Sequence, residues 1–231
     1  MKALLVVVGL LLGLLVLVDR VSVGYAEDQV ATQLAEKGGL LGTPEVDIAG
    51  FPFLTQAIGG RYDDVRISLT AEELGQPEGT RADVTLRGVE VPLSSVLSGS
   101  VREVPVQRVD GTATLSYELL SAQLGGDTTL RREGDRLRIT RTVDVLGQTL
   151  PLTATGTVTL EGNDLVVDVE DASGAGVEVP GFLVDRAADL LDLRYTIPAL
   201  PFGLQLTDVT PADDGVDVRV QATDTVLRAP E

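Results

Sequence analysis

The chain has 231 residues, a formal net charge of −17, and neither cysteine nor histidine. The absence of these two residue types excludes disulfides, Ser-His and Cys-His catalytic pairs, and the usual zinc ligand sets. The acidic balance argues against a nucleic-acid partner and against electrostatic docking on anionic lipid headgroups, because both need clustered Lys and Arg.

The N-terminus carries an apolar run from Ala3 to Val18, which ends at the charged pair Asp19-Arg20. At about 1.5 Å per helical residue the run covers roughly 24 Å, close to the roughly 30 Å core of a bilayer. We therefore interpret residues 1–18 as a signal anchor or a signal peptide. Small residues at Gly24 and Ala26 offer a cleavage site before Glu27.

The stretch from Asp19 to Lys37 favours an uncleaved anchor, because it continues the apolar run as one predicted helix. Its apolar residues recur on one helical face: Val23, Ala26, Val30 and Leu34. Lys2 is the only basic residue before the run, and the large acidic remainder is consistent with export. We expect residues 19–231 to form a single domain on the extracytoplasmic face of the plasma membrane.

Beyond Thr43 the dominant pattern is alternation of apolar and polar residues, which is typical of half-buried antiparallel strands. Helical patterns are fewer and are predicted over 112–124 and 180–193, with a short turn at 92–97. The sequence therefore predicts an α+β fold with one large meandering antiparallel sheet. The expected strands include residues 65–69, 84–91, 104–109, 137–145, 152–160, 165–169 and 216–222.

Several motifs resemble those of the actinobacterial LmeA-like family, also known as domain of unknown function 2993. The most specific is Gly50-Phe51-Pro52-Phe53-Leu54-Thr55, which precedes Gly60-Arg61-Tyr62. Weaker matches are Gly88-Val89-Glu90-Val91-Pro92-Leu93, Gly111-Thr112-Ala113 and Leu200-Pro201-Phe202-Gly203-Leu204. The resemblance implies a tubular lipid-binding (TULIP-like) fold, in which a strongly curved antiparallel sheet wraps around a long helix and leaves an apolar groove. It also implies phospholipid binding outside the plasma membrane, a role in envelope lipoglycan elongation, no catalytic residues and no cofactor.

Two groups of residues are candidates for lining this groove. Pro52 places its neighbours at a strand end or edge, where they form either a groove lip or an ordinary packed corner. The candidates at this corner are Phe51, Phe53 and Leu54. The second group lies on the apolar parity of the predicted central strands, where the alternative is ordinary core. It comprises Leu137, Ile139, Arg141, Val143, Ala154, Gly156 and Val158.

Arg141 stands out because it shares the parity of Leu137 and Ile139, so it needs a carboxylate, a backbone carbonyl or an anionic headgroup as its partner. A β-bulge that returns Arg141 to solvent is the alternative. By contrast, Arg136 and Arg138 share the polar parity of their strand and are expected on a solvated face.

Three functions compete. A lipid-binding protein requires a long apolar surface, because burial of acyl chain yields about 0.8 kcal/mol per methylene. An envelope scaffold or regulator of a membrane glycosyltransferase would instead have a close-packed interior. A hydrolase using Asp and Glu alone lacks a supporting nucleophile motif, and no metal site is expected because the calcium-loop spacing is absent. The sequence therefore favours a non-enzymatic phospholipid-binding protein.

Overall fold

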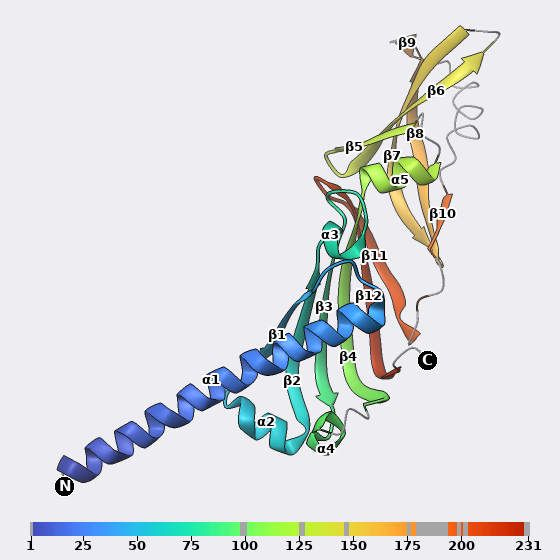
Figure 1. Cartoon of the computed structure of the whole chain (residues 1–231). Helices are drawn as coiled ribbons and strands as arrows, with labels where there is room; N and C mark the ends of the chain where they lie inside the picture. The colour runs from blue at the N-terminus through green and yellow to red at the C-terminus, as the bar shows by residue number, and fades with distance from the viewer. Residues whose placement is uncertain are drawn as a thin grey trace. The chain divides into compact units, whose positions relative to one another are not determined.

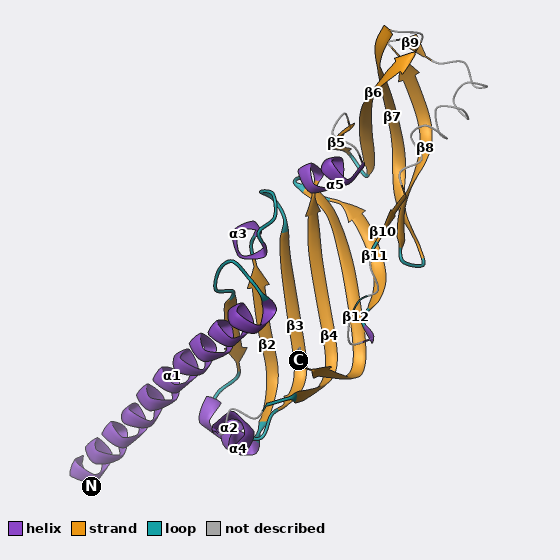
Figure 2. Cartoon of the chain, turned by 45° about the vertical axis from the view of Figure 1, so that its right-hand side comes forward, coloured by secondary structure: helices purple, strands orange, loops and turns teal. Residues whose placement is uncertain are grey.

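The computed structural model describes residues 2–97, 101–124, 128–145, 148–174, 177–178, 194–197, 200 and 203–228. It confirms the α+β class, with a long N-terminal helix and antiparallel strand pairs (Figure 2). The strands form two sheets, in the orders β1-β2-β3-β4-β12-β11 and β10-β8-β7-β6-β5, with β9 paired to β8. The expectation of one meandering sheet is therefore corrected to two.

The chain divides into two compact units. Unit 1 comprises residues 1–69, 83–110 and 222–231, and unit 2 comprises residues 70–82 and 111–221. Strands β4 (Glu103–Ser116) and β12 (Gly215–Arg228) contribute residues to both units. The single-domain organisation expected for residues 19–231 remains a prediction.

Unit 1 is built from helices and strands that follow one another along the chain (Figure 1). These elements are α1 (Lys2–Gly38), β1 (Glu45–Ala49), α2 (Phe53–Gly59), β2 (Arg61–Leu69), β3 (Arg81–Glu90) and α4 (Leu93–Leu97), followed by the first part of β4. The short turn predicted at 92–97 is confirmed as α4. The buried apolar residues of unit 1 come from β1 to β4, from α1 and α2, and from the end of β12.

Helix α1 has two parts with different surroundings. Residues 3–18 are exposed, and this segment is long and apolar enough to cross a membrane. From Asp19 onward the helix packs against β1 and α2, which confirms the helix predicted over 19–37. Val23 is buried as expected, whereas Ala26, Val30 and Leu34 are only half-buried and Ala31 is buried in addition.

Strand β1 is an edge strand that pairs only with β2 among the described strands. The backbone N–H of Ile48 donates a hydrogen bond of 2.8 Å to the Glu27 carboxylate of α1. A side chain of the helix thus satisfies a donor that would otherwise stay open at the sheet edge.

The polar face of unit 1 carries a row of alternating charges. Asp47 pairs with Arg66 at 3.5 Å, and Arg66 pairs with Asp64 at 3.2 Å. Asp64 also lies 3.6 Å from Arg87, which pairs with Asp110 at 2.7 Å. This row keeps one face of the sheet in water and leaves the other face for apolar packing.

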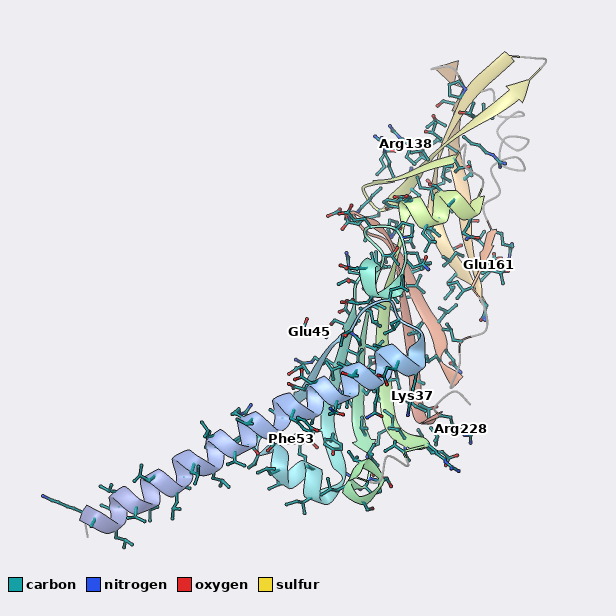
Figure 3. All side chains as sticks on the ribbon, viewed as in Figure 1. Lys37, Glu45, Phe53, Arg138, Glu161 and Arg228 are labelled. Atoms are coloured by element: carbon teal, nitrogen blue, oxygen red, sulfur yellow. The ribbon has the colours of Figure 1, made fainter. Side chains whose placement is uncertain are left out.

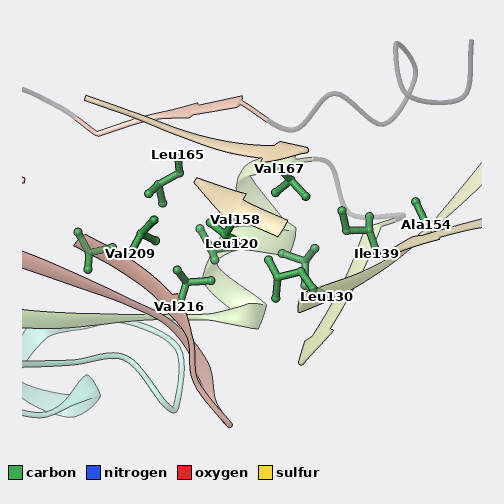
Figure 4. Close-up of a cluster of buried hydrophobic side chains, with 11 residues drawn as sticks. Leu120, Leu130, Ile139, Ala154, Val158, Leu165, Val167, Val209 and Val216 are labelled. Atoms are coloured by element: carbon green, nitrogen blue, oxygen red, sulfur yellow. The ribbon is translucent and has the colours of Figure 1, made fainter. Parts of the chain in front are cut away.

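The described residues of unit 2 include two helices and all the strands of the second sheet. Its elements are α3 (Ala71–Leu74), α5 (Tyr117–Leu124), β5 (Thr128–Glu133), β6 (Arg136–Val145), β7 (Gln148–Glu161), β8 (Asp164–Gly174), β9 (Val177–Glu178), β10 (Arg194–Thr196) and β11 (Gln205–Pro211). One buried apolar cluster joins α5, β5, β6, β7, β8 and β11 with the first part of β12 (Figure 4). It comprises Leu120, Leu130, Leu137, Ile139, Ala154, Val158, Leu165, Val167, Val209, Val216 and Val218.

The helix predicted over 112–124 is wrong in its first five residues, which belong to strand β4. Helix α5 begins at Tyr117, where the Ser116 hydroxyl accepts a hydrogen bond of 3.2 Å from the backbone N–H of Leu119. Serine in this position is a typical N-cap, and it marks the true start of the helix. The helix predicted over 180–193 lies outside the described residues.

Candidate functional site

The predicted groove residues of β6 and β7 come together in the buried cluster of unit 2. The register pairs Ile139 with Ala154 and Leu137 with Gly156. Ile139 is 0% exposed and Ala154 is 1% exposed, and Leu137 and Val158 are also buried. In this conformation these side chains contact other protein atoms only, so contact with an acyl chain requires the cluster to open.

Gly156 lies where the backbone of β8 closely approaches β7. The register between these strands shifts between Thr155 and Gly156. A Cβ atom added at Gly156 would lie 2.3 Å from the backbone oxygen of Asp168, far inside contact distance. Glycine is required here by this close backbone approach, as is typical beside a bulge.

Arg141 keeps the parity that the sequence assigned to it. The pairing of β6 with β5 and with β7 is unbroken around Arg141, which lies opposite Thr128 and Leu152. The bulge that would have returned it to solvent is therefore absent from β6, and Arg141 is half-buried. The side chain of Val143 lies outside the described part of the structure.

Thr128 is a polar residue on the same face that sequence reasoning missed. It is buried, and its hydroxyl has no hydrogen-bond partner among the described residues. The available signal was its spacing of two residues from Leu130 along β5, which places both residues on the same buried face. Thr128 and Arg141 together place polar groups beside the buried apolar cluster.

The candidates Phe51, Phe53 and Leu54 belong to unit 1, where they follow β1 and begin α2. Phe53 is labelled in Figure 3. Phe53 is buried, and its ring centroid lies 6.2 Å from that of Tyr62. Leu54 is half-buried, whereas Phe51 is exposed, with the Arg20 guanidinium 5.1 Å from its ring centroid. The segment thus follows the end of β1, as predicted, and Pro52 is the N-cap residue of α2.

Asp19 fixes this corner to α1. It is 1% exposed, and its carboxylate accepts a hydrogen bond of 2.9 Å from the backbone N–H of Leu54 in the first turn of α2. The N-cap residue Pro52 makes no side-chain cap of its own, so Asp19 supplies the cap from another helix. Sequence reasoning treated Asp19 only as the end of the apolar run.

An open depression of about 510 Å³ lies on unit 2 and is lined by Tyr117, Arg131, Arg132, Gly134 and Asp213. Arg132 pairs with Asp213 at 2.8 Å, and the Tyr117 hydroxyl donates to the Ala212 carbonyl at 2.7 Å. Desolvation by burial raises the pKa of Tyr117 to about 12, opposed by the nearby Arg132 cation. Three of the five lining residues, Arg131, Arg132 and Asp213, are charged.

The raised pKa of Tyr117 predicts that the protein loses stability in strong alkali. The unfolded chain ionises a tyrosine near pH 10, whereas folded Tyr117 ionises near 12. The folded state therefore holds a proton that the unfolded state has lost, and the free energy of unfolding falls as the pH rises through this window. We expect Tyr117→Phe to weaken this pH dependence in urea unfolding, and Tyr25→Phe, at an exposed position, to leave it unchanged.

Charged side chains elsewhere on unit 2 form surface ion pairs. Arg136 pairs with Glu170 at 2.9 Å, and Arg138 pairs with Glu133; both arginines are exposed, as predicted. Among the residues that the structure describes, no group of three or more acidic side chains is placed to hold a metal ion. These charged side chains make a hydrated surface on unit 2.

Comparison with known proteins identifies the chain. Residues 17–221 match the family model described as LmeA-like phospholipid-binding. The chain belongs to this family. No curated protein and no solved structure matches it. Membership in the LmeA-like family supports lipid binding, and the matched region contains every candidate groove residue.

Proposed function

We propose that this protein is a non-enzymatic phospholipid-binding protein of the extracytoplasmic face of the plasma membrane, where it supports assembly of envelope lipid or lipoglycan. The observation that carries the proposal is the family match over residues 17–221. The exposed apolar part of α1 supports attachment to the membrane. The acidic composition of the remainder is consistent with export.

The apolar cluster of unit 2, which includes Leu137, Ile139 and Ala154, supplies the surface on which acyl chains would lie. Arg141 and Thr128 would then contact the phosphate of the headgroup, since a guanidinium and a buried hydroxyl both donate hydrogen bonds to anionic oxygen. The closed cluster must separate to admit the lipid.

A second function is supported by the burial of that cluster. The 0% exposure of Ile139 is typical of a close-packed core. A scaffold or regulator of a membrane glycosyltransferase would have such a core and no lipid ligand. Lipid uptake separates the two functions directly.

We expect the delipidated protein to take up about one diacyl phospholipid per chain, in native mass spectrometry and in a fluorescent-lipid transfer assay. A chelator should leave uptake unchanged, because the described residues contain no metal-ligand cluster. Arg141→Ala should reduce uptake of anionic lipid selectively, and Arg138→Ala, at an exposed position on the same strand, is the matched control. Failure of the wild-type protein to take up any phospholipid would favour the scaffold function.

A further inference from the structure

Large apolar side chains remain exposed at one end of unit 1. Phe51 is 59% exposed just before α2, and Ile58 is 77% exposed within it. Val96 of neighbouring α4 is also exposed. The two short helices lie side by side (Figures 1 and 2), joined where the Val91 N–H donates to the Gly60 carbonyl at 2.8 Å.

The apolar segment of α1 leaves unit 1 at this same end. Asp19, the first residue after the segment, bonds to the backbone of Leu54 in α2. Arg20 lies over the ring of Phe51 at 5.1 Å. Because α1 is one unbroken helix through this point, the position of the membrane relative to unit 1 is set by the helix and its bonds to α2 and β1.

The length of the apolar segment brings this end of unit 1 close to the bilayer. Sixteen helical residues span roughly 24 Å, about 6 Å less than a typical hydrocarbon core. A short span is accommodated by thinning of the bilayer and by immersion of its flanking residues. Val21 and Tyr25 continue an exposed apolar stripe beyond Asp19, and tyrosine is typical of the membrane interface.

We propose that Phe51 and Ile58 insert into the interfacial layer of the phospholipid bilayer that α1 spans, so that unit 1 is docked on the membrane surface. Apolar insertion, and not attraction to anionic headgroups, drives this contact, because the protein is strongly acidic. The inference rests on the retention of α1 proposed above, and it is independent of whether unit 2 binds a lipid.

The chain contains no tryptophan, so a single introduced tryptophan reports on its own surroundings. We would place it at Ile58, with Phe51→Trp as a second variant, in the full-length protein reconstituted into phosphatidylcholine and phosphatidylglycerol vesicles. Leu41→Trp is the matched control, because Leu41 is 78% exposed and follows the far end of α1. The helix from Asp19 to Gly38 rises about 29 Å, which removes Leu41 from the proposed contact.

We expect brominated phospholipids to quench the Ile58→Trp and Phe51→Trp variants at least twofold, and aqueous acrylamide to quench them several-fold less than Leu41→Trp. Equal acrylamide quenching at positions 58 and 41 would overturn the proposal. Protection from acrylamide without quenching by brominated lipid would also overturn it, because a protein surface would then cover Ile58. Intact mass confirms that α1 is present, and circular dichroism confirms folding. This experiment does not measure lipid uptake by unit 2, so a failure of the docking proposal cannot be confused with a failure of the lipid-binding proposal.

Discussion

The Ala154→Phe variant is expected to unfold at a lower urea concentration than the wild-type protein. Ala154 is 1% exposed and lies opposite Ile139 within the buried cluster of unit 2. A phenyl ring at this position has no free volume to occupy, so neighbouring side chains must leave their preferred rotamers. Overpacking of this kind typically costs about 1 to 3 kcal/mol of the free energy of unfolding.

The control for this variant is Thr155→Phe on the opposite face of the same strand, where the side chain is only half-buried. It should change the unfolding free energy much less. Phospholipid uptake measured on the same proteins distinguishes a core from a groove. An Ala154→Phe protein that keeps its unfolding midpoint but loses phospholipid would contradict the packed-core interpretation and would place an open groove at Ala154.

A chain that begins at Glu27 is expected to be less stable than a chain that begins at Asp19, by about 2 to 5 kcal/mol. The shorter chain lacks the Asp19 cap on α2, and losing a cap costs about 0.5 to 2 kcal/mol. It also lacks buried Val23, whose burial contributes about 1.5 to 3 kcal/mol. Urea unfolding of the two proteins, monitored by circular dichroism, measures the difference.

The same contacts predict that the anchor is retained in the mature protein. Cleavage before Glu27 would remove Asp19, which caps α2, and the buried Val23, so N-terminal sequencing of the membrane-extracted protein should find the original N-terminus. In the chain that begins at Asp19, Asp19→Ala removes the cap on α2 alone, and Asp28→Ala, at an exposed position of α1, is its stability control. A mature start at Glu27, with equal stability of the two truncated chains, would refute this prediction.

Much of the fold follows from local patterns in the sequence. The alternation of Leu137, Ile139 and their polar neighbours fixed β6 and its buried face correctly, because period-two burial is a property of a single strand. The predicted start of α5 was wrong because threonine and leucine at 112–115 fit both the periodicity of a helix and that of a strand. Only the N-cap at Ser116 separates strand from helix there.

Those local patterns could not predict contacts between segments that are distant in the sequence. The hydrogen bond between Asp19 and Leu54 joins residues 35 positions apart, and neither residue carries a local signal for it. The division of the strands into two sheets is likewise set by long-range pairing, as between β11 and β12.

The candidate groove shows the same limit in a different form. Apolar residues on one strand face are required both by a packed core and by a lipid-lined groove, so parity cannot distinguish these two environments. Gly156 is instructive, because a small residue suggests an open channel, whereas the structure shows the backbone of Asp168 filling the space where a Cβ would lie. Support for a lipid ligand therefore comes from the family match and not from the strand pattern.

The bond between Glu27 and the Ile48 N–H has a consequence for molecules that share a membrane. Proteins anchored in one bilayer diffuse in two dimensions, and their effective concentration is far above that of the same number of copies in solution. An open β1 edge would then be offered repeatedly to neighbouring copies for strand addition. With α1 as the proposed membrane anchor, the helix that would crowd the copies together also supplies the carboxylate that occupies this edge donor, and it would restrain the copies from polymerising through β1.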